Sequence, residues 1–166
     1  HRKGGIANVC IIVACFFGAI SGSGPATVAA LGAVLVPAMV ERGGFSAPFS
    51  TALMATASSI AIVIPPSIAF VVYASITGVS IGDMFMAGIV PGILMGLALI
   101  VVVMLEVRKN HVVPSNVQKA SAKERLDAFK DAFWGFLMPV IILGGIYGGI
   151  FTPTEQQPFL LYMAFL

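Results

Sequence analysis

The stretch SGSGPATVAALG, residues 21–32, interrupts a sequence in which apolar residues otherwise follow one another almost without a break. It places small residues and a proline between an apolar run that ends at Ile20 and another that begins at Val28. Such a break leaves backbone N–H and C=O groups without helical partners, which a bilayer tolerates only inside protein or beside a water-filled cavity. The sequence therefore predicts a sheltered turn between two short helices.

The composition identifies the surrounding solvent as a lipid bilayer. Of the 166 residues, 58% are hydrophobic and 10% are charged, with a mean hydropathy of +1.02, whereas soluble domains carry about 25% charged residues. A formal net charge of +2 is too small to indicate a nucleic-acid partner. We expect an all-α, polytopic membrane fold, and a chain that is a fragment of a longer protein.

Apolar segments divide the chain into expected membrane elements, since a span needs about 20 residues. Residues 6–20 and 25–40 are only about 15 residues long each, so we expect 6–40 to form a re-entrant helical hairpin. The other expected elements are a broken, discontinuous transmembrane helix at 46–79, a span at 84–107, a cytoplasmic loop at 108–132, a span at 133–151 and the start of a truncated span at 152–166.

The basic residues fit one orientation of these elements. None of the nine falls in 43–107 or after 130; they are Arg2, Lys3, Arg42, Arg108, Lys109, Lys119, Lys123, Arg125 and Lys130. A hairpin followed by a crossing and a return puts all of them in the cytoplasm, as the positive-inside rule prefers. Two full spans within 6–40 would give the same sidedness, so length and the polar tip favour the hairpin. In the loop, SAKE at 121–124 begins a capping-box pattern that predicts a short amphipathic helix.

A second break, SSIAIVIPPSIAF at 58–70, interrupts the segment at 46–79. Pro65 and Pro66 have no N–H, so the carbonyls of Ala61 and Ile62 are expected to lose their helical donors. Hydroxyls surround this turn, from Ser58, Ser59 and Ser67. A single proline in a membrane helix usually makes only a kink, and we interpret Pro37 and Pro91 in that way. A Pro-Pro pair flanked by three serines instead indicates a functional break.

The two breaks together predict an ion and substrate site. Free carbonyls at helix C-termini suit a cation and free N–H groups at N-termini suit an anion, and secondary transporters combine such half-helices near the bilayer midplane. All seven acidic residues lie at segment ends or in loops, so no mid-span carboxylate offers a proton relay. Hydroxyl and carbonyl oxygens can replace the water around Na⁺. Sodium is therefore favoured as the coupling ion, and no Cys/His cluster indicates any other cofactor.

Three motifs occur in order: GAISGSGPATVAALGAVLVPAMVERGGFS at 18–46, IVIPPSI at 62–68 and GGIFTPTE at 148–155. With them, residues 4–155 resemble the large membrane (M) subunit of a TRAP transporter, the tripartite ATP-independent periplasmic family. The resemblance implies the hairpin and broken helix of a first inverted repeat and the start of a second. It also implies Na⁺-coupled uptake of organic acids, such as C4-dicarboxylates or sialic acid, across the bacterial inner membrane. The implied partners are a small membrane subunit and a periplasmic substrate-binding protein.

The same resemblance implies the residues of the site. Carried onto this sequence, it assigns the sodium ion to Ser21, Gly22, Ser23, Ser59 and Ile62, and the substrate to Gly24, Ile64, Pro65, Pro66 and Ser67. The chain departs from the family pattern in two places. Residues 61–63 lack the glycine often found before the Pro-Pro pair, and QQPF follows TPTE where an alanine-rich helix is usual. Glu155 is interpreted as part of a capping box within TPTE, not as a functional carboxylate.

Other function classes explain fewer of these features. An intramembrane serine protease would use GSG at 22–24 as its nucleophile motif. Its serine would need a general base within hydrogen-bond distance, but His1 and His111 both lie outside the expected spans. A non-transporting scaffold would explain small residues such as Ala29 and Gly32 through tight helix packing, but not the two breaks. An ion channel remains open at this stage, and uptake that requires a binding protein would separate it from a transporter.

Overall fold

The structure is a computed structural model that describes residues 4–110, together with 130, 133, 137, 140–141 and 143–148. Within these residues every regular element is helical, which confirms the all-α class for the described part of the chain. Most of the expected loop at 108–132 lies outside the described residues, as do part of the expected span at 133–151 and all of 152–166.

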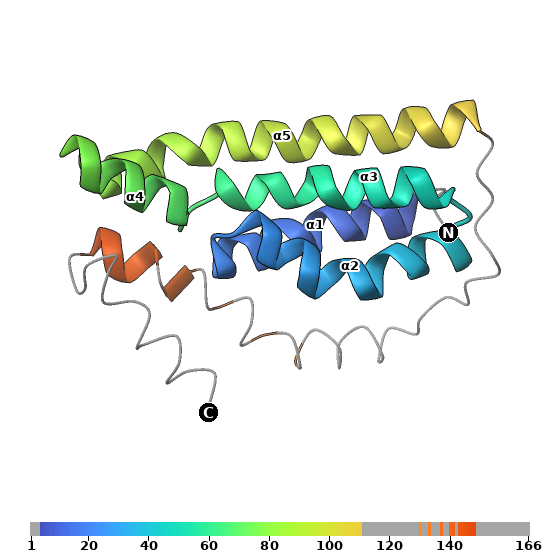
Figure 1. The fold of residues 1–166 in the computed structure, drawn as a ribbon, viewed down its shortest axis with the longest axis horizontal. Coiled ribbons are helices and arrows are strands. Elements are labelled where there is room, and N and C mark those ends of the chain that lie inside the picture. Colours follow the sequence, from blue (N-terminus) through green and yellow to red (C-terminus); the bar gives the residue numbers. More distant parts are fainter. Residues whose placement is uncertain are drawn as a thin grey trace.

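The first two helices form an antiparallel hairpin (Figure 1). Helix α1 is Gly5–Ser21 and helix α2 is Gly24–Glu41. Gly22 ends α1 in the left-handed conformation, with φ of +62°, and its N–H donates to the Gly18 carbonyl at 2.8 Å. Ser23 caps α2 by accepting from the Ala26 N–H. The helices have 17 and 18 residues, so the expected arms of about 15 residues were too short and length alone does not separate a hairpin from two spans.

The next segment is a helix with a long interruption. Helix α3, Ala47–Ser58, passes into the 3-10 turn η1, Ser59–Ile62, and helix α4 resumes only at Ile68–Thr77. The Pro-Pro pair explains the gap, because neither proline donates a helical hydrogen bond and the residue before each is driven out of the helical region. Ser67 begins α4 as its N-cap and accepts from the Phe70 N–H at 3.4 Å.

Helix α5, Ile81–Lys109, is the longest element and extends beyond the expected span at 84–107 at both ends. Its 29 residues correspond to about 44 Å of helix, and Pro91 lies inside it, as Pro37 lies inside α2. By length and composition, α2 and α5 are the two described helices able to cross a membrane.

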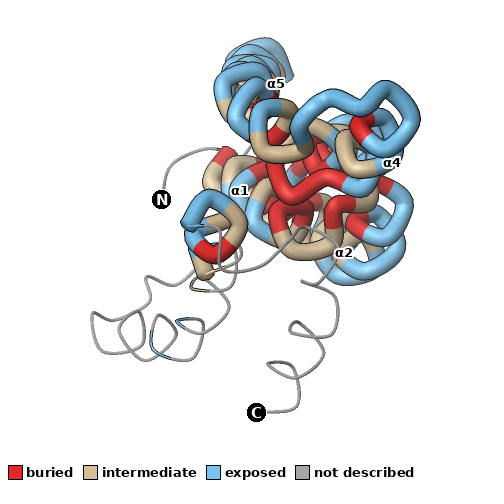
Figure 2. The backbone as a smooth tube through the Cα atoms, turned by 90° about the vertical axis from the view of Figure 1, so that its left-hand side faces the viewer, coloured by how far each residue is buried: buried red, intermediate tan, exposed pale blue. Residues whose placement is uncertain are grey.

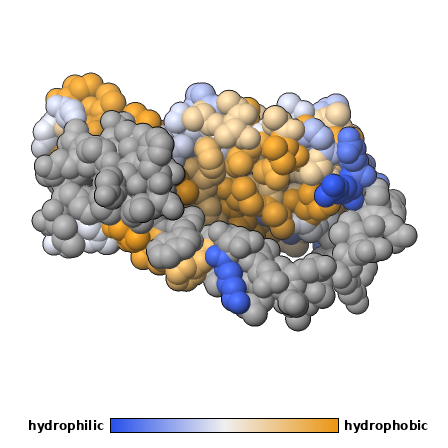
Figure 3. Space-filling model, turned by 90° about the horizontal axis from the view of Figure 1, so that it is seen from below, coloured by the Kyte–Doolittle hydropathy of each residue, from blue (hydrophilic) through white to orange (hydrophobic). Residues whose placement is uncertain are grey.

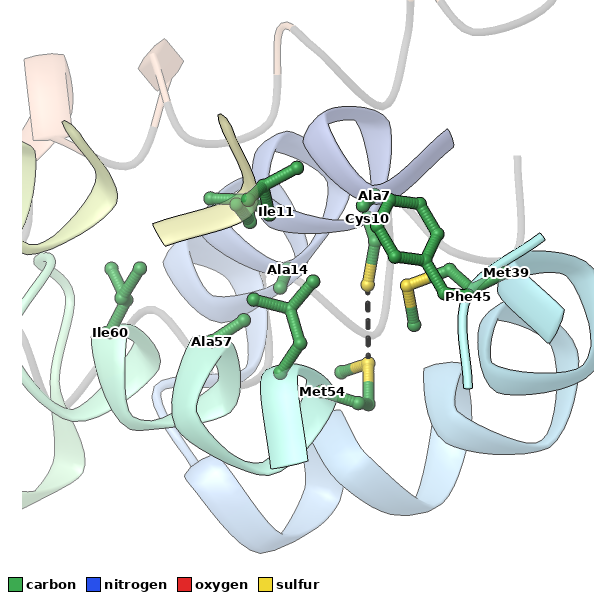
Figure 4. Packing of buried hydrophobic residues seen from close by; sticks show 11 residues of the cluster. Ala7, Cys10, Ile11, Ala14, Met39, Phe45, Met54, Ala57 and Ile60 are labelled. Carbon is green, nitrogen blue, oxygen red and sulfur yellow. Dashed lines mark hydrogen bonds between the residues drawn. The ribbon is translucent and has the colours of Figure 1, made fainter. Parts of the chain in front are cut away.

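The core lies where α1 packs against α2, α3 and α5 (Figure 4). Cys10 of α1 contacts Met54 of α3, with the thiol donating to the thioether sulfur at 3.7 Å. Ala14 and Ala57 are fully buried between these helices, and such small residues allow membrane helices to approach closely.

The outer surface is apolar. Large hydrophobic side chains are exposed along α5, among them Val90, Leu94, Leu97 and Val101, and the outer side of this helix is exposed along much of its length (Figure 2). Apolar residues also cover the middle of the face shown in Figure 3. A soluble monomer rarely exposes so continuous an apolar surface, whereas lipid and neighbouring membrane helices match it.

Candidate functional site

The hairpin tip and the interrupted helix, which the sequence analysis combines into one expected site, contact each other. The Ile68 N–H at the start of α4 donates to the Gly22 carbonyl at 3.4 Å. A Cβ atom added to Gly22 would lie 2.8 Å from the Pro66 carbonyl oxygen, and one added to Gly24 would lie 3.2 Å from the Ser58 carbonyl oxygen. Only glycine permits backbones to approach this closely at the tip.

Four helix ends therefore meet in one place. The tip joins the C-terminus of α1 to the N-terminus of α2, and the interruption joins the C-terminus of η1 to the N-terminus of α4. Carbonyls at the C-termini carry partial negative charge and N–H groups at the N-termini carry partial positive charge. Such a meeting point offers backbone groups to both a cation and an anion.

Hydroxyl groups are linked within the tip. The Thr27 hydroxyl donates to the Ser23 carbonyl at 2.8 Å and lies 3.2 Å from the Ser21 hydroxyl, which accepts from the Ser23 N–H at 3.3 Å. Ser21 and Ser23 are half-buried, whereas Thr27 is buried. Thr27 was not among the predicted site residues. Its spacing of four residues after Ser23 was the available signal, because threonine hydroxyls bond the carbonyl four residues earlier in a helix.

The facing interruption has a hydroxyl of its own. Ser67, 1% exposed, donates to the Ile62 carbonyl at 2.6 Å. The Ile62 carbonyl has no helical donor, as expected, because Pro66 lacks an N–H. It is nevertheless not free, because the serine hydroxyl takes the place of the missing N–H. A carbonyl oxygen has two lone pairs, so one hydrogen bond does not use up the Ile62 oxygen. Ser59, the first residue of η1, donates to the Ala55 carbonyl of the preceding helix α3 at 3.5 Å.

Helix α5 supports the interruption from the other side. A Cβ at Gly88 would meet the Val63 carbonyl oxygen and the Phe70 ring, and a Cβ at Gly92 would meet the Ile64 side chain. Ile64, predicted to bind substrate, thus packs against α5. Of the remaining predicted residues, Pro65, Pro66 and Ser67 are buried, and Gly22, Gly24, Ile62 and Pro66 come together where the tip meets the break.

The donor set defines what this place could bind. Among the described residues, no group of three His, Cys, Asp or Glu side chains could hold a metal ion. The oxygens available at the tip and the interruption are hydroxyls and backbone carbonyls, which suit a hard monovalent cation more than a soft transition metal.

Comparison with known proteins supplies the family. A family model described as "Tripartite ATP-independent periplasmic transporter, DctM component" matches residues 1–166. The C4-dicarboxylate TRAP transporter large permease protein DctM of Vibrio cholerae is 46% identical over 153 residues, which cover 92% of this chain and 33% of that protein. The isethionate TRAP transporter permease protein DctMQ of Oleidesulfovibrio alaskensis is 50% identical over 152 residues, covering 92% and 24%. The ectoine TRAP transporter large permease protein TeaC of Halomonas elongata is 48% identical over 157 residues, covering 93% and 36%. The chain thus spans roughly a third or less of the length of these relatives.

Proposed function

The chain belongs to the DctM-component family of tripartite ATP-independent periplasmic transporters, and on this premise we propose that it is part of a Na⁺-coupled importer of organic acids. The named relatives are transporter permeases, which are not enzymes. In our proposal the importer lies in the bacterial inner membrane, works with a small membrane subunit, and receives its substrate from a periplasmic binding protein.

The names of the relatives bear on the substrate. They specify C4-dicarboxylate, isethionate and ectoine, although their identities to this chain are close to one another, at 46%, 50% and 48%. We therefore propose that this segment contributes the shared ion-coupling and translocation machinery, and that selection among organic acids depends on the binding protein. C4-dicarboxylates and sialic acid remain the substrate classes that the motifs favour.

The contact between the hairpin tip and the interrupted helix is the observation that carries the proposal. It joins two helix C-termini and two helix N-termini around Gly22 and Pro66. Carbonyls at the C-termini, with the hydroxyls of Ser21 and Ser23, are suited to Na⁺, and N–H groups at the N-termini are suited to a substrate carboxylate. This is the arrangement by which secondary transporters hold an ion beside an anionic substrate.

The position of the tip along α5 supports a re-entrant hairpin. Helix α1 begins beside Val107, where a Cβ at Gly4 would lie 3.1 Å from a methyl group, and Cys15 lies next to Gly96. The interruption packs on Gly92 and Gly88. These two glycines lie roughly 10–16 Å along the helix axis from the first residue of α5. Since the hydrocarbon core is about 30 Å thick, a tip at this level lies inside the membrane if α5 spans it.

Uptake by the complete transporter in proteoliposomes tests the function. Radiolabelled succinate, sialic acid, isethionate and ectoine are each offered with the matching binding protein, with and without an inward Na⁺ gradient. We expect uptake of one of them only when both binding protein and gradient are present. Uptake that is equally fast without Na⁺ contradicts the coupling, and flux that needs no binding protein supports a channel instead.

A double substitution tests the sodium site. Changing Ser21→Ala together with Ser23→Ala should raise the Na⁺ concentration for half-maximal uptake while the protein still reaches the membrane. An unchanged Na⁺ dependence in a well-folded double variant would remove both hydroxyls from the site.

A further inference from the structure

Thr27 lies directly behind the hairpin tip, and its hydroxyl contacts both serines of the proposed ion site. We propose that Thr27 is a positioning residue: it holds the hydroxyl hydrogen of Ser21 away from the site, so that the Ser21 oxygen presents a lone pair to the coupling ion. This proposal rests on the Na⁺-coupled function proposed above and adds a residue that the motifs do not assign to the site.

The hydrogen bonds of the tip determine where each hydroxyl hydrogen points. A hydroxyl has one hydrogen and two acceptor lone pairs. The hydrogen of Thr27 is directed at the Ser23 carbonyl, 2.8 Å away, so in the 3.2 Å contact between Ser21 and Thr27 the donor is Ser21. The Ser21 hydroxyl also lies 3.4 Å from the Ser23 carbonyl, a second acceptor within the tip. In either case the Ser21 hydrogen stays inside the tip.

The Ser21 oxygen keeps one lone pair free for a ligand. Its first lone pair accepts the Ser23 N–H at 3.3 Å. The second lone pair has no partner within the part of the chain that the structure describes. Ser21 is half-buried, so its oxygen can still be reached by a ligand. A cation binds a hydroxyl through a lone pair and is repelled by its hydrogen, so an orientation fixed in advance favours the bound state without reorganisation.

Thr27 itself does not reach the ion in this arrangement. Its side chain is 0% exposed and lies one helical turn beyond the N-cap Ser23. Its hydrogen and one lone pair are used by the two serines. It therefore acts through Ser21. Removing its hydroxyl leaves the Ser21 hydrogen with only the longer contact to the Ser23 carbonyl, at 3.4 Å, so this hydrogen is held less firmly away from the ion.

Equilibrium binding of radioactive Na⁺ to the complete purified transporter tests the proposal without any organic substrate. Thr27→Val keeps the shape of the side chain and removes the hydroxyl, and it should raise the Na⁺ concentration for half-saturation by about 2- to 10-fold, as expected for one ordinary hydrogen bond. The amount of Na⁺ bound at saturation should not change. Thr27→Ser restores the hydroxyl and should bind as the parent does. Thr51→Val is the matched control, because Thr51 makes the same bond to a carbonyl four residues earlier, at 2.9 Å, on the exposed side of α3.

Several results would overturn the proposal. They are an unchanged half-saturation in Thr27→Val, an equal shift in Thr27→Ser, or a loss of bound Na⁺ at saturation with no shift, which would indicate a structural role. If the valine variant does not fold, Thr27→Ala removes the same hydroxyl and must show the same shift. A parent protein that binds no Na⁺ saturably contradicts the proposed function itself and is thereby distinguished from failure of the Thr27 inference.

Discussion

Replacing Gly22 with alanine tests whether the contact between the hairpin tip and the interrupted helix holds the site together. Gly22 has a φ of +62°, a conformation that destabilises any residue with a Cβ by about 1–2 kcal/mol. The new Cβ would also lie 2.8 Å from the Pro66 carbonyl oxygen and 3.2 Å from the Ile68 nitrogen. Because both are backbone atoms that no rotamer change can move, overpacking adds about 1–3 kcal/mol. We expect a total loss of about 2–5 kcal/mol.

Gly78→Ala separates the two effects. Gly78 ends α4 with a φ of +72°, and nothing lies within 4 Å of an added Cβ, so this variant carries only the conformational penalty of about 1–2 kcal/mol. Melting temperatures in detergent and proteoliposome uptake are measured on the same preparations of the complete transporter. The melting temperature should fall about twice as far in Gly22→Ala as in Gly78→Ala, and uptake should be lost only in Gly22→Ala. Equal melting temperatures and equal uptake in the two variants would refute the close contact and the site built on it.

Three further predictions concern the interruption and the tip. Changing Pro65→Ala together with Pro66→Ala should let a continuous helix form across the interruption, since each interior proline destabilises a helix by about 3 kcal/mol relative to alanine. The melting temperature should stay the same or rise while uptake is lost. Normal uptake by this variant would show that the break is only a kink. Gly88→Ala should impair folding or uptake because the new Cβ meets the backbone of the interruption. Gly96→Ala, whose Cβ would have only a sulfur atom at 3.8 Å, should match the parent in thermal melting and uptake. Equal melting temperatures and uptake in the two variants would contradict the packing of α5 on the interruption. Ser23→Cys, in a background free of the two native cysteines, should resist an impermeant thiol reagent applied from the periplasm, and free labelling in every transport state would show that the tip is not re-entrant.

The helix interruptions were predictable because their causes are local. Gly22 and Pro65 act on the chain next to them, through a left-handed conformation and a missing N–H. The Ser23 and Ser67 caps follow from the same local chemistry. Helix lengths were less predictable, since the 17- and 18-residue arms include cap-proximal glycine and serine that the hydropathy pattern excludes.

The details of the candidate site depended on side chains meeting across the fold or across a turn. The Ser67 hydroxyl reaches the Ile62 carbonyl at 2.6 Å, so a carbonyl expected to be free has a donor. Ile64 packs against α5 at Gly92, although the motif assigns it to the substrate. Thr27 joins the tip through two hydroxyl contacts. Pattern reading identifies which backbone groups lose helical partners, but not which side chains replace those partners.

The sequence by itself determined the lipid environment, the all-helical class of the described part, the family, and the places where the helices stop. The family follows from the three motifs in their order along the chain. The other properties depend on composition and on the conformational limits of single residues, which act over one or two turns of chain. The tertiary structure alone supplied the contact that joins the hairpin tip to the interruption, from the Ile68 N–H to the Gly22 carbonyl. It also supplied the packing of α5 on the interruption through Gly88 and Gly92. The contact between the hairpin tip and the interruption joins residues more than 40 positions apart in sequence, 22 and 68. It depends on helix packing, because backbones approach so closely only where side chains are absent.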